Sequence, residues 1–450
     1  MIRQNFNADW TVEKGSGDSR MNSFLGNAAV KTVHLPYDAM IHEVRTPDTK
    51  NGAQTGFYPG GEYIFQKHFT APQAWQGKPV SLVFEGVYQT ALVYLNGWLL
   101  TRNVNGYAEF TVEAGPYLKY GADNLLKVIA DNSLEPNSRW YTGSGIYRPV
   151  RLLVGNKVYL PQDTVRITTR EADEGFALLD VTAQVQSAST VTERVTLQQT
   201  ICREGTAVLT DRQNLLLQPG ESRTVSFRYC VDSPALWSPE NPNLYTSTMQ
   251  VLEGEEELDR EETGFGIRTL SIDAAHGVRI NGQTVKLRGA CIHHDNGILG
   301  AATLPDAEER RIRQLKEAGF NAIRSSHHPA GRALLDACDR YGVLVMDELS
   351  DVWNVRKNPY DYALYFEQDW KPTIQKMVAK DYNHPSVILY CVGNEISEAG
   401  SESGAETNRR LCNTFRELDP TRYTTNALNG LMAAGYRLRE IMGDVMRKFP

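Results

Sequence analysis

The residues best suited to chemistry in this 450-residue chain close an apolar run, VILYCVGNEIS, at residues 387–397. A run with hardly a polar side chain predicts a strand buried on both faces, as in a parallel sheet, and places Glu395 at its C-terminal edge. Barrel enzymes hold their chemistry at that edge. A carboxyl group half shielded by apolar walls could hold a proton near neutral pH, which makes Glu395 the first candidate for a general acid/base. A glutamate that simply leaves a strand for solvent is the alternative.

Polar clusters also follow three other predicted strands of the same region. They are His293-His294-Asp295, Arg324–His328 and Asp347-Glu348, and Asn394 stands directly before Glu395. In a closed barrel these strand ends converge on one mouth. A site rich in histidine, arginine, asparagine and carboxylates suits a polyhydroxylated substrate, because it offers many hydrogen-bond donors and acceptors and one group able to protonate a leaving oxygen.

Each cluster also has a structural interpretation. Neighbouring residues that leave a strand point to opposite sides, so His293-His294 and His327-His328 are poor metal pairs, and one histidine of each pair is expected to be structural. Asp347-Glu348 could merely cap the next helix. Arg324 is expected to pair with one of these carboxylates, either as a structural contact or to tune a pKa.

Strands and helices alternate through the last third of the chain, which predicts a parallel sheet with right-handed crossovers. Five strand–helix units can be counted, with 398–406 as a polar loop before the fourth helix. The predicted strands are 287–292, 320–324, 343–347, 387–392 and 422–426, and the predicted helices are 306–318, 331–341, 366–382, 407–418 and 431–447.

The first two thirds of the chain have a β pattern throughout. Residues 1–155 predict a sandwich, with strands at 63–69, 80–84, 92–95 and 125–129 and a hairpin turn at Asn96-Gly97. Residues 156–268 are richer in Thr and Val, and the regular spacing of their strands fits a seven-stranded immunoglobulin-like sandwich. A further hairpin at Asn281-Gly282 leads into the alternating segment, 269–450.

Composition narrows the range of partners. The net charge is −7 with Lys and Arg scattered, so neither nucleic acid nor an anionic membrane is expected as a partner. There is no apolar run of membrane-spanning length, the N-terminus lacks a signal-peptide pattern, and the six cysteines are far apart; together these favour free thiols and a cytoplasmic location. The motifs GxSxG, GxxxxGK[ST], HExxH and GxGxxG are absent, which leaves serine hydrolysis, ATP use and hydride transfer without support.

Four stretches of the last segment resemble the barrel of glycoside hydrolase family 2, the β-galactosidase and β-glucuronidase group. They are LRGACIHHDNG, FNAIRSSHHPA, DRYGVLVMDEL and NHPSVILYCVGNE. Upstream, SRWYTGSGIYRPV resembles the end of the family's sugar-binding jelly roll, and LWSPENPNLYT with GFGIR resembles its immunoglobulin-like domain. The resemblance covers nearly the whole chain and implies a multidomain β plus α/β fold: a jelly-roll sandwich, an immunoglobulin-like sandwich and about five of the eight units of a TIM barrel.

The resemblance also implies roles for individual residues. Glu395 becomes the acid/base, Asn394 holds the 2-hydroxyl of the sugar, and His327 favours the transition state. His293 occupies the family's first-strand histidine position. The family retains anomeric configuration, which needs a second carboxylate about 5–5.5 Å from the first. In the family this nucleophile ends the seventh barrel strand.

This sequence contains only five of the predicted barrel strands before Pro450, whereas the family's nucleophile ends the seventh. The nucleophile is therefore expected to lie outside this sequence, and the chain alone is expected to be inactive. Glu348 and Arg324 are expected to bind or orient the substrate. Some family members hold magnesium with a histidine after the third strand, but DELSDVW has none, so no metal and no other cofactor is expected. Trp353 could stack on a sugar ring or be a buried structural residue.

The sequence thus predicts a retaining exo-β-glycosidase, most like a β-galactosidase, with β-glucuronidase and β-mannosidase specificity left open. The alternative from another class is a carbohydrate-binding protein with a vestigial barrel, in which Trp98, Trp140 and Tyr141 form a platform or simply pack in the core. An incomplete barrel predicts poor solubility or association of the isolated chain, and the full-length protein is expected to be a homo-oligomer.

Overall fold

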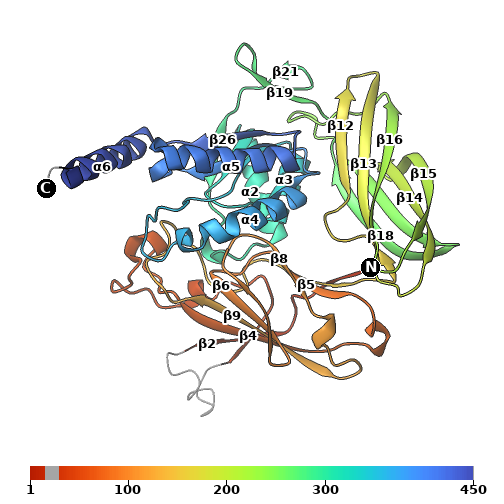
Figure 1. Ribbon diagram of the computed structural model, residues 1–450, viewed down its shortest axis with the longest axis horizontal. Helices are drawn as coiled ribbons and strands as arrows, with labels where there is room; N and C mark the ends of the chain where they lie inside the picture. The colour runs from red at the N-terminus through yellow and green to blue at the C-terminus, as the bar shows by residue number, and fades with distance from the viewer. Residues whose placement is uncertain (16–29, 449–450) are drawn as a thin grey trace.

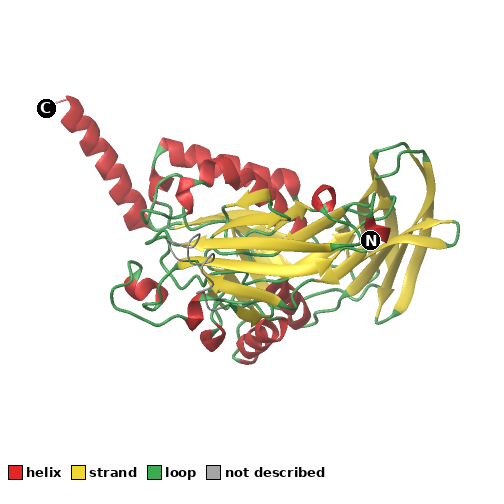
Figure 2. Cartoon of the chain, turned by 90° about the horizontal axis from the view of Figure 1, so that it is seen from below, coloured by secondary structure: helices red, strands yellow, loops and turns green. Residues whose placement is uncertain are grey.

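The computed structural model describes residues 1–15 and 30–448. Two β sandwiches flank a parallel sheet with its helices, and the last helix, α6, projects away from the rest (Figures 1 and 2). The fold class expected from the sequence is confirmed. Among the described helices, none combines the length and the apolar character that a membrane crossing requires.

The first sandwich consists of two antiparallel sheets with strand orders β1-β10-β5-β8 and β3-β2-β4-β9-β6-β7. Asn96 and Gly97 form the turn between β6 and β7 with φ of 52° and 90°, as the hairpin pattern predicts. The strands are β1 Ile2–Asn5, β2 Trp10–Lys14, β3 Lys31–Val33, β4 Gly61–Thr70, β5 Val80–Phe84, β6 Thr90–Leu95, β7 Trp98–Asn103, β8 Phe110–Glu113, β9 Asp123–Asn132 and β10 Val150–Val154. The 3₁₀ turns of this part are η1 Met40–His42, η2 Gly52–Thr55, η3 Gln73–Trp75 and η4 Gly115–Tyr117.

The second sandwich packs the sheet β15-β14-β17-β18 against a sheet built on β13, with β11, β12 and β16. Its core consists of residues that alternate along each strand, such as Leu179, Val181 and Val185 on β13, all of them buried. The strands are β11 Val158–Tyr159, β12 Arg166–Ala172, β13 Phe176–Ser187, β14 Glu193–Arg203, β15 Thr206–Leu217, β16 Ser222–Asp232, β17 Tyr245–Glu253 and β18 Glu256–Phe265.

The third part begins with a small antiparallel sheet, β19-β20-β21, and continues as the parallel sheet β22-β23-β24-β25-β26. Its strands are β19 Leu270–Asp273, β20 Gly277–Ile280, β21 Gln283–Thr284, β22 Gly289–Ile292, β23 Ala322–Ser325, β24 Leu344–Glu348, β25 Val387–Asn394 and β26 Tyr423–Ala427. The helices are α2 Pro305–Glu317, α3 Arg332–Tyr341, α4 Phe366–Asp381, α5 Glu402–Leu418 and α6 Gly430–Lys448, with 3₁₀ turns η5 Gly297–Leu299, η6 Tyr362–Leu364 and η7 Ser397–Gly400.

The predicted loop at 398–406 is wrong. Helix α5 begins at Glu402, because the Ser401 side chain accepts a hydrogen bond from the Gly404 backbone N–H and caps the first turn. The glycine that indicated a loop lies inside this turn. It is close packed there, since a Cβ atom at Gly404 would lie 1.8 Å from the carbonyl oxygen of Glu398.

A buried ion-pair cluster joins the two sandwiches to the parallel sheet. Arg332 at the start of α3 donates to both carboxylate oxygens of Glu109, at 2.8 and 2.9 Å, and pairs at 2.5 Å with Asp163 of the second sandwich. Burial pushes the pKa of Asp163 up, but Arg332 overcomes this effect and holds it at about 2. One guanidinium therefore fixes three segments that are far apart in the sequence.

Replacing Arg332 with Met is expected to lower the free energy of unfolding by about 3 kcal/mol, because the largely buried Asp163 loses its ion-pair partner and Glu109 retains only Arg151. Urea unfolding followed by fluorescence measures the change. Arg340→Met is the control, because the Arg340–Glu309 pair is exposed and is expected to contribute less than about 1 kcal/mol. Equal losses in the two variants would contradict the role given to the cluster.

Candidate active site

The polar clusters at the ends of β22, β23, β24 and β25 gather at one rim, and a segment of the first sandwich lies across it. Arg324 donates from Nε to Glu348 Oε2 at 2.6 Å, and His327 Nδ1 lies 2.6 Å from Glu348 Oε1. Glu348 is fully buried, and a buried carboxylate needs hydrogen-bond partners; these two contacts satisfy both of its oxygens. The ion pair predicted for Arg324 is present, and it fixes His327 at the rim.

Asn394, the last residue of β25, is held from two sides. Its side-chain oxygen accepts from Arg324 Nη2, and its Nδ2 donates to Asp351 Oδ1 at 2.7 Å. The Lys357 ammonium donates to its backbone oxygen at 2.7 Å. Asn394 is 4% exposed, so this network fixes the direction of its amide group.

Glu395 follows in a left-handed backbone conformation, with φ of 47°. Its backbone N–H donates to the carbonyl of Ala427 on the neighbouring β26 at 2.7 Å. The conformation turns the carboxyl group away from the apolar interior, where the next residue, Ile396, is buried. The side chain of Glu395 is therefore 35% exposed.

The expectation that apolar walls keep a proton on Glu395 is wrong for this conformation. Asn429 Nδ2 donates to Oε1 at 3.0 Å, and Arg139 Nη1 donates to Oε2 at 3.1 Å. The hydrogen bond from Asn429 is the largest influence and lowers the pKa of Glu395, partial burial acts against it, and Arg139 lowers it further. In this state the carboxyl group is ionised at neutral pH.

The rim also contains three residues that sequence reasoning missed: Arg139, Asp351 and Lys357. Arg139 comes from the first sandwich and donates to both oxygens of Asp351, at 2.6 and 3.0 Å, while Lys357 donates to Oδ1 at 2.9 Å. Burial raises the pKa of Asp351, but Arg139 and Lys357 outweigh it and hold the carboxylate ionised. The only sequence feature that pointed to Arg139 was the density of arginine and aromatic residues around it. Its contacts with Asp351 and Glu395 span more than 200 residues, and such contacts leave no local sequence pattern.

The four histidines separate into two pairs, as alternation along the chain predicts. His293 and His327 face each other edge to face at 5.4 Å, and both lie beside Trp140 of the first sandwich, at 5.1 and 5.5 Å. His294 Nδ1 and His328 Nε2 lie 3.1 Å apart in the interior. Burial lowers the pKa of His294 to about 3, so this second pair is uncharged and structural.

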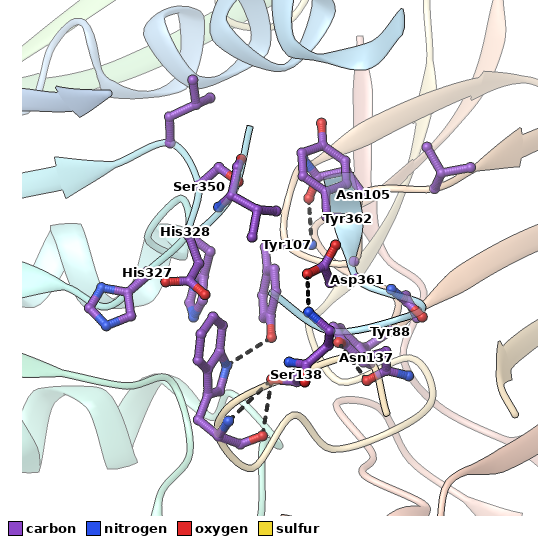
Figure 3. A pocket seen from close by; sticks show the side chains of 18 residues that line it. Tyr88, Asn105, Tyr107, Asn137, Ser138, His327, His328, Ser350, Asp361 and Tyr362 are labelled. Carbon is purple, nitrogen blue, oxygen red and sulfur yellow. Dashed lines mark hydrogen bonds between the residues drawn. The ribbon is translucent and has the colours of Figure 1, made fainter. Parts of the chain in front are cut away.

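A cavity lies between the first sandwich and the rim (Figure 3). Tyr107 stacks on His328 with ring centroids 3.8 Å apart, and its hydroxyl accepts from Trp140 Nε1 at 3.0 Å. His327 and Asp351 line the same cavity from the sheet side. It is thus bounded by aromatic rings and by hydrogen-bonding groups, a combination that is typical of ligand sites.

Two alternatives that the sequence left open are decided at the rim. Trp353 is fully buried and donates from Nε1 to the carbonyl of Val392 at 2.9 Å, so it packs in the core and offers no face to a sugar. Asp347 and Glu348 cap no helix, because α4 begins only at Phe366. Asp347 Oδ1 instead accepts from Ser325 Oγ and from the Ala330 backbone N–H, and so anchors the loop that carries His327.

The residues after β24 do not fit a magnesium ion. Both oxygens of Glu348 are bound to Arg324 and His327, and the hydroxyl of Ser350 donates to the carbonyl of Val352. No free set of oxygen ligands of the kind that magnesium prefers is left among these side chains. A separate group at the opposite end of β25, Asp336, Asp339 and His384, is held together by a 2.6 Å contact between His384 and Asp339.

The three aromatic residues considered as a binding platform have different surroundings. Trp140 lies over the rim histidines, whereas the hydroxyl of Tyr141 donates to Asp38 at 2.6 Å. Trp98 is 65% exposed on the edge strand β7, where Tyr117 is its aromatic neighbour. They contact separate sets of residues, and only Trp140 belongs to the rim.

Fold and site together define a protein with two β sandwiches and a barrel-type parallel sheet whose strand ends carry a polar site. Comparison with known families supports this class. Residues 10–176 match "Glycosyl hydrolase 2 galactose-binding domain-like", residues 158–268 match "Glycosyl hydrolases family 2", and residues 274–445 match "Glycosyl hydrolases family 2, TIM barrel domain". The chain therefore belongs to glycoside hydrolase family 2, as its sequence motifs indicate.

Several relatives are similar over most of the chain. The "Beta-galactosidase BoGH2A" of Bacteroides ovatus is 37% identical over 90% of this chain and 48% of its own length, and a "Putative beta-glucuronidase" of Formosa agariphila is 32% identical over 94% and 40%. The crystal structure of a family 2 member from Bacteroides cellulosilyticus superposes with a TM-score of 0.92 at 35% identity, covering 97% of this chain and 57% of that one. The chain spans about half the length of the curated relatives that it matches.

Removing either contact to Glu395 is expected to raise its pKa. Asn429→Ala removes the larger influence and Arg139→Gln the smaller, so the titration midpoint of Glu395 should move up from below its ordinary value of 4.5 in both variants. Carbon-13 NMR of chains with labelled glutamate carboxyl groups measures the midpoint, with Glu395→Gln identifying the signal. Arg416→Gln, which removes an exposed cation on α5 that does not contact Glu395, is the control. A midpoint that did not change in the Asn429 and Arg139 variants would refute this electrostatic description.

Proposed function

We propose that this chain forms the sugar-binding and acid/base part of the active site of a retaining β-glycosidase, with a β-galactoside as substrate. The observation that carries the proposal is the placement of Asn394 and Glu395 at the end of β25, beside His327, Arg324 and Trp140. The 37% identity to a protein named as a β-galactosidase favours galactose. Similarity to proteins named as β-glucuronidases keeps glucuronides in the test panel.

Each rim residue has a proposed task. The sugar ring lies over Trp140 and His293, since an aromatic face packs against the apolar face of a pyranose. Asn394 hydrogen-bonds the 2-hydroxyl from its fixed orientation. His327 shares its Nδ1 side with Glu348, which leaves Nε2 for a sugar hydroxyl. These groups bind and orient, which brings the glycosidic bond close to Glu395.

Glu395 acts twice in the proposed reaction. It first gives its proton to the glycosidic oxygen as the bond to the anomeric carbon breaks and a second carboxylate attacks that carbon; it then takes a proton from the water that releases the sugar. The ionised form in this structure suits the second step. For the first step the pKa of Glu395 must rise, so the bound leaving group has to displace Asn429 or Arg139 from the carboxyl group.

The second carboxylate is proposed to come from a part of the protein beyond the five described barrel strands. Glu348 has both oxygens committed to Arg324 and His327, and Asp351 is committed to Arg139, Lys357 and Asn394. Neither is free to attack an anomeric carbon without leaving buried cations unpaired. The 450-residue chain alone is accordingly expected to bind sugars without turning them over.

The proposal predicts a leaving-group-dependent defect in Glu395→Gln. In a protein that extends this chain through a complete barrel, the variant should lose about 10²- to 10⁴-fold in kcat/KM on methyl β-galactoside, which needs protonation of its leaving oxygen. It should lose far less on 2,4-dinitrophenyl β-galactoside, which does not. Assays on matched galactosides, glucuronides and mannosides test the sugar at the same time. Wild-type turnover of methyl β-galactoside by the variant would refute the role of Glu395.

Association of copies is also part of the proposal. Helix α6 projects from the fold (Figure 1) and exposes an apolar stripe: Leu431 is 88%, Leu438 62% and Met442 60% exposed. Light scattering of the purified chain is expected to give a mass above that of one copy, and replacing Leu431 and Leu438 with Glu should lower it. A monodisperse monomer for the unchanged chain would contradict this expectation.

A further inference from the structure

A cleft lined with cations lies next to Glu395, and its lining shares no residue with the lining of the aromatic cavity described above. Among the residues whose side chains the structure describes, its lining includes Arg139, Arg356, Lys357 and Arg439, and no carboxylate. Arg139 is the residue that donates to Glu395, and Ser397 of the same lining is only two positions further along the chain. The cleft is thus continuous with the proposed catalytic carboxyl group.

Two of these cations, Arg356 and Arg439, have no carboxylate partner among the described side chains. Arg139 and Lys357 share Asp351 between them. Arg356 donates to the carbonyl of Pro359 at 3.1 Å, and neither it nor Arg439 forms an ion pair within the part of the chain that the structure describes. The whole chain has a net charge of −7, so this positive site does not reflect the general composition. A cleft with unpaired guanidinium groups attracts an anion.

The position of the cleft beside Glu395 indicates which part of a glycoside it would contact. A general acid contacts the glycosidic oxygen, and the sugar and the leaving group lie on opposite sides of that atom. The aromatic cavity with Trp140 and His327 accounts for the sugar side. The cleft with Arg356 and Arg439 therefore faces the leaving group.

We propose that this cleft is a leaving-group subsite that selects β-glycosides whose aglycone carries a carboxylate. The inference rests on the proposed role of Glu395 and extends it to the substrate class. Planar guanidinium groups bind a carboxylate through paired hydrogen bonds, and Arg356 and Arg439 approach the cleft from two elements, the loop after β24 and helix α6. The carboxylate would then lie beyond the bond that breaks, not on the sugar that is released.

The experiment compares lactobionate with lactitol by calorimetry on the 450-residue chain at low ionic strength. Both are β-galactosides with an open-chain aglycone, and lactobionate has a carboxylate where lactitol has a hydroxymethyl group. Lactobionate is expected to bind about fivefold or more tightly, with a preference that declines as salt is added. The double variant Arg356→Gln/Arg439→Gln should reduce this preference to within about twofold, whereas Arg416→Gln on α5, an exposed arginine outside the cleft, should preserve it.

Each other outcome has a defined meaning. Equal binding of the two ligands by the unchanged chain would overturn the subsite and leave the galactosidase proposal standing. A preference that survives in the double variant would also overturn it, because another group would then bind the carboxylate. Binding of neither ligand would overturn the galactoside assignment and the subsite together. Phenyl β-glucuronide, with its carboxylate on the sugar side, serves as a further arm, and any dependence of its binding on the two arginines would contradict the placement.

Discussion

The site depends on one guanidinium that crosses between domains. Arg139 belongs to the first sandwich, yet it donates two hydrogen bonds to Asp351 and one to Glu395, both at the rim of the parallel sheet. The charge of Arg139 at this domain boundary is compensated only if its partner carboxylate is held in place. Lys357 and Asn394 hold Asp351 there by donating hydrogen bonds to it. The position of the first sandwich therefore contributes, together with Asn429, to the electrostatic state of the proposed catalytic carboxyl group.

The remaining rim residues form a continuous network with this link. Asn394 connects Asp351 to Arg324, and Arg324 connects to Glu348, which in turn holds His327. Each buried polar group in the series is satisfied by the next one, so the side chains that face a sugar are fixed before it binds. Glu395 differs, because it is one third exposed and is held by only two contacts. It is the member of the site best able to move when a substrate enters.

Much of this arrangement could be predicted from the sequence, and the reasons are physical. Strand runs and helices bounded by Pro and Gly predicted all five strands of the parallel sheet and their helices, because local patterning determines them, but only some of the strands of the two sandwiches. The clusters after β22–β25 did gather at one rim, because parallel strands share a C-terminal edge. The start of α5 was missed, because the capping by Ser401 had to be weighed against a glycine in the first turn. The role of Trp353 was left open, because an aromatic residue after a strand has the same sequence pattern whether it faces a cavity or the core.

Electrostatics were the least predictable part. The sequence placed Glu395 correctly at a strand end, but its pKa depends on Arg139 and Asn429, and Arg139 lies more than 250 positions away. The left-handed backbone conformation of Glu395 could not be predicted from the sequence either, since residues other than glycine seldom adopt it. Long-range charge contacts of this kind arise only once the domains are packed together.

A crystal structure of the chain with bound lactose is the most direct test of the whole account. The account predicts that the galactose ring lies between Trp140 and Asn394, and that the glycosidic oxygen is about 3 Å from the carboxyl group of Glu395. Lactose bound elsewhere, such as on the exposed Trp98 of the first sandwich, or Glu395 turned away from the bound sugar, would contradict it.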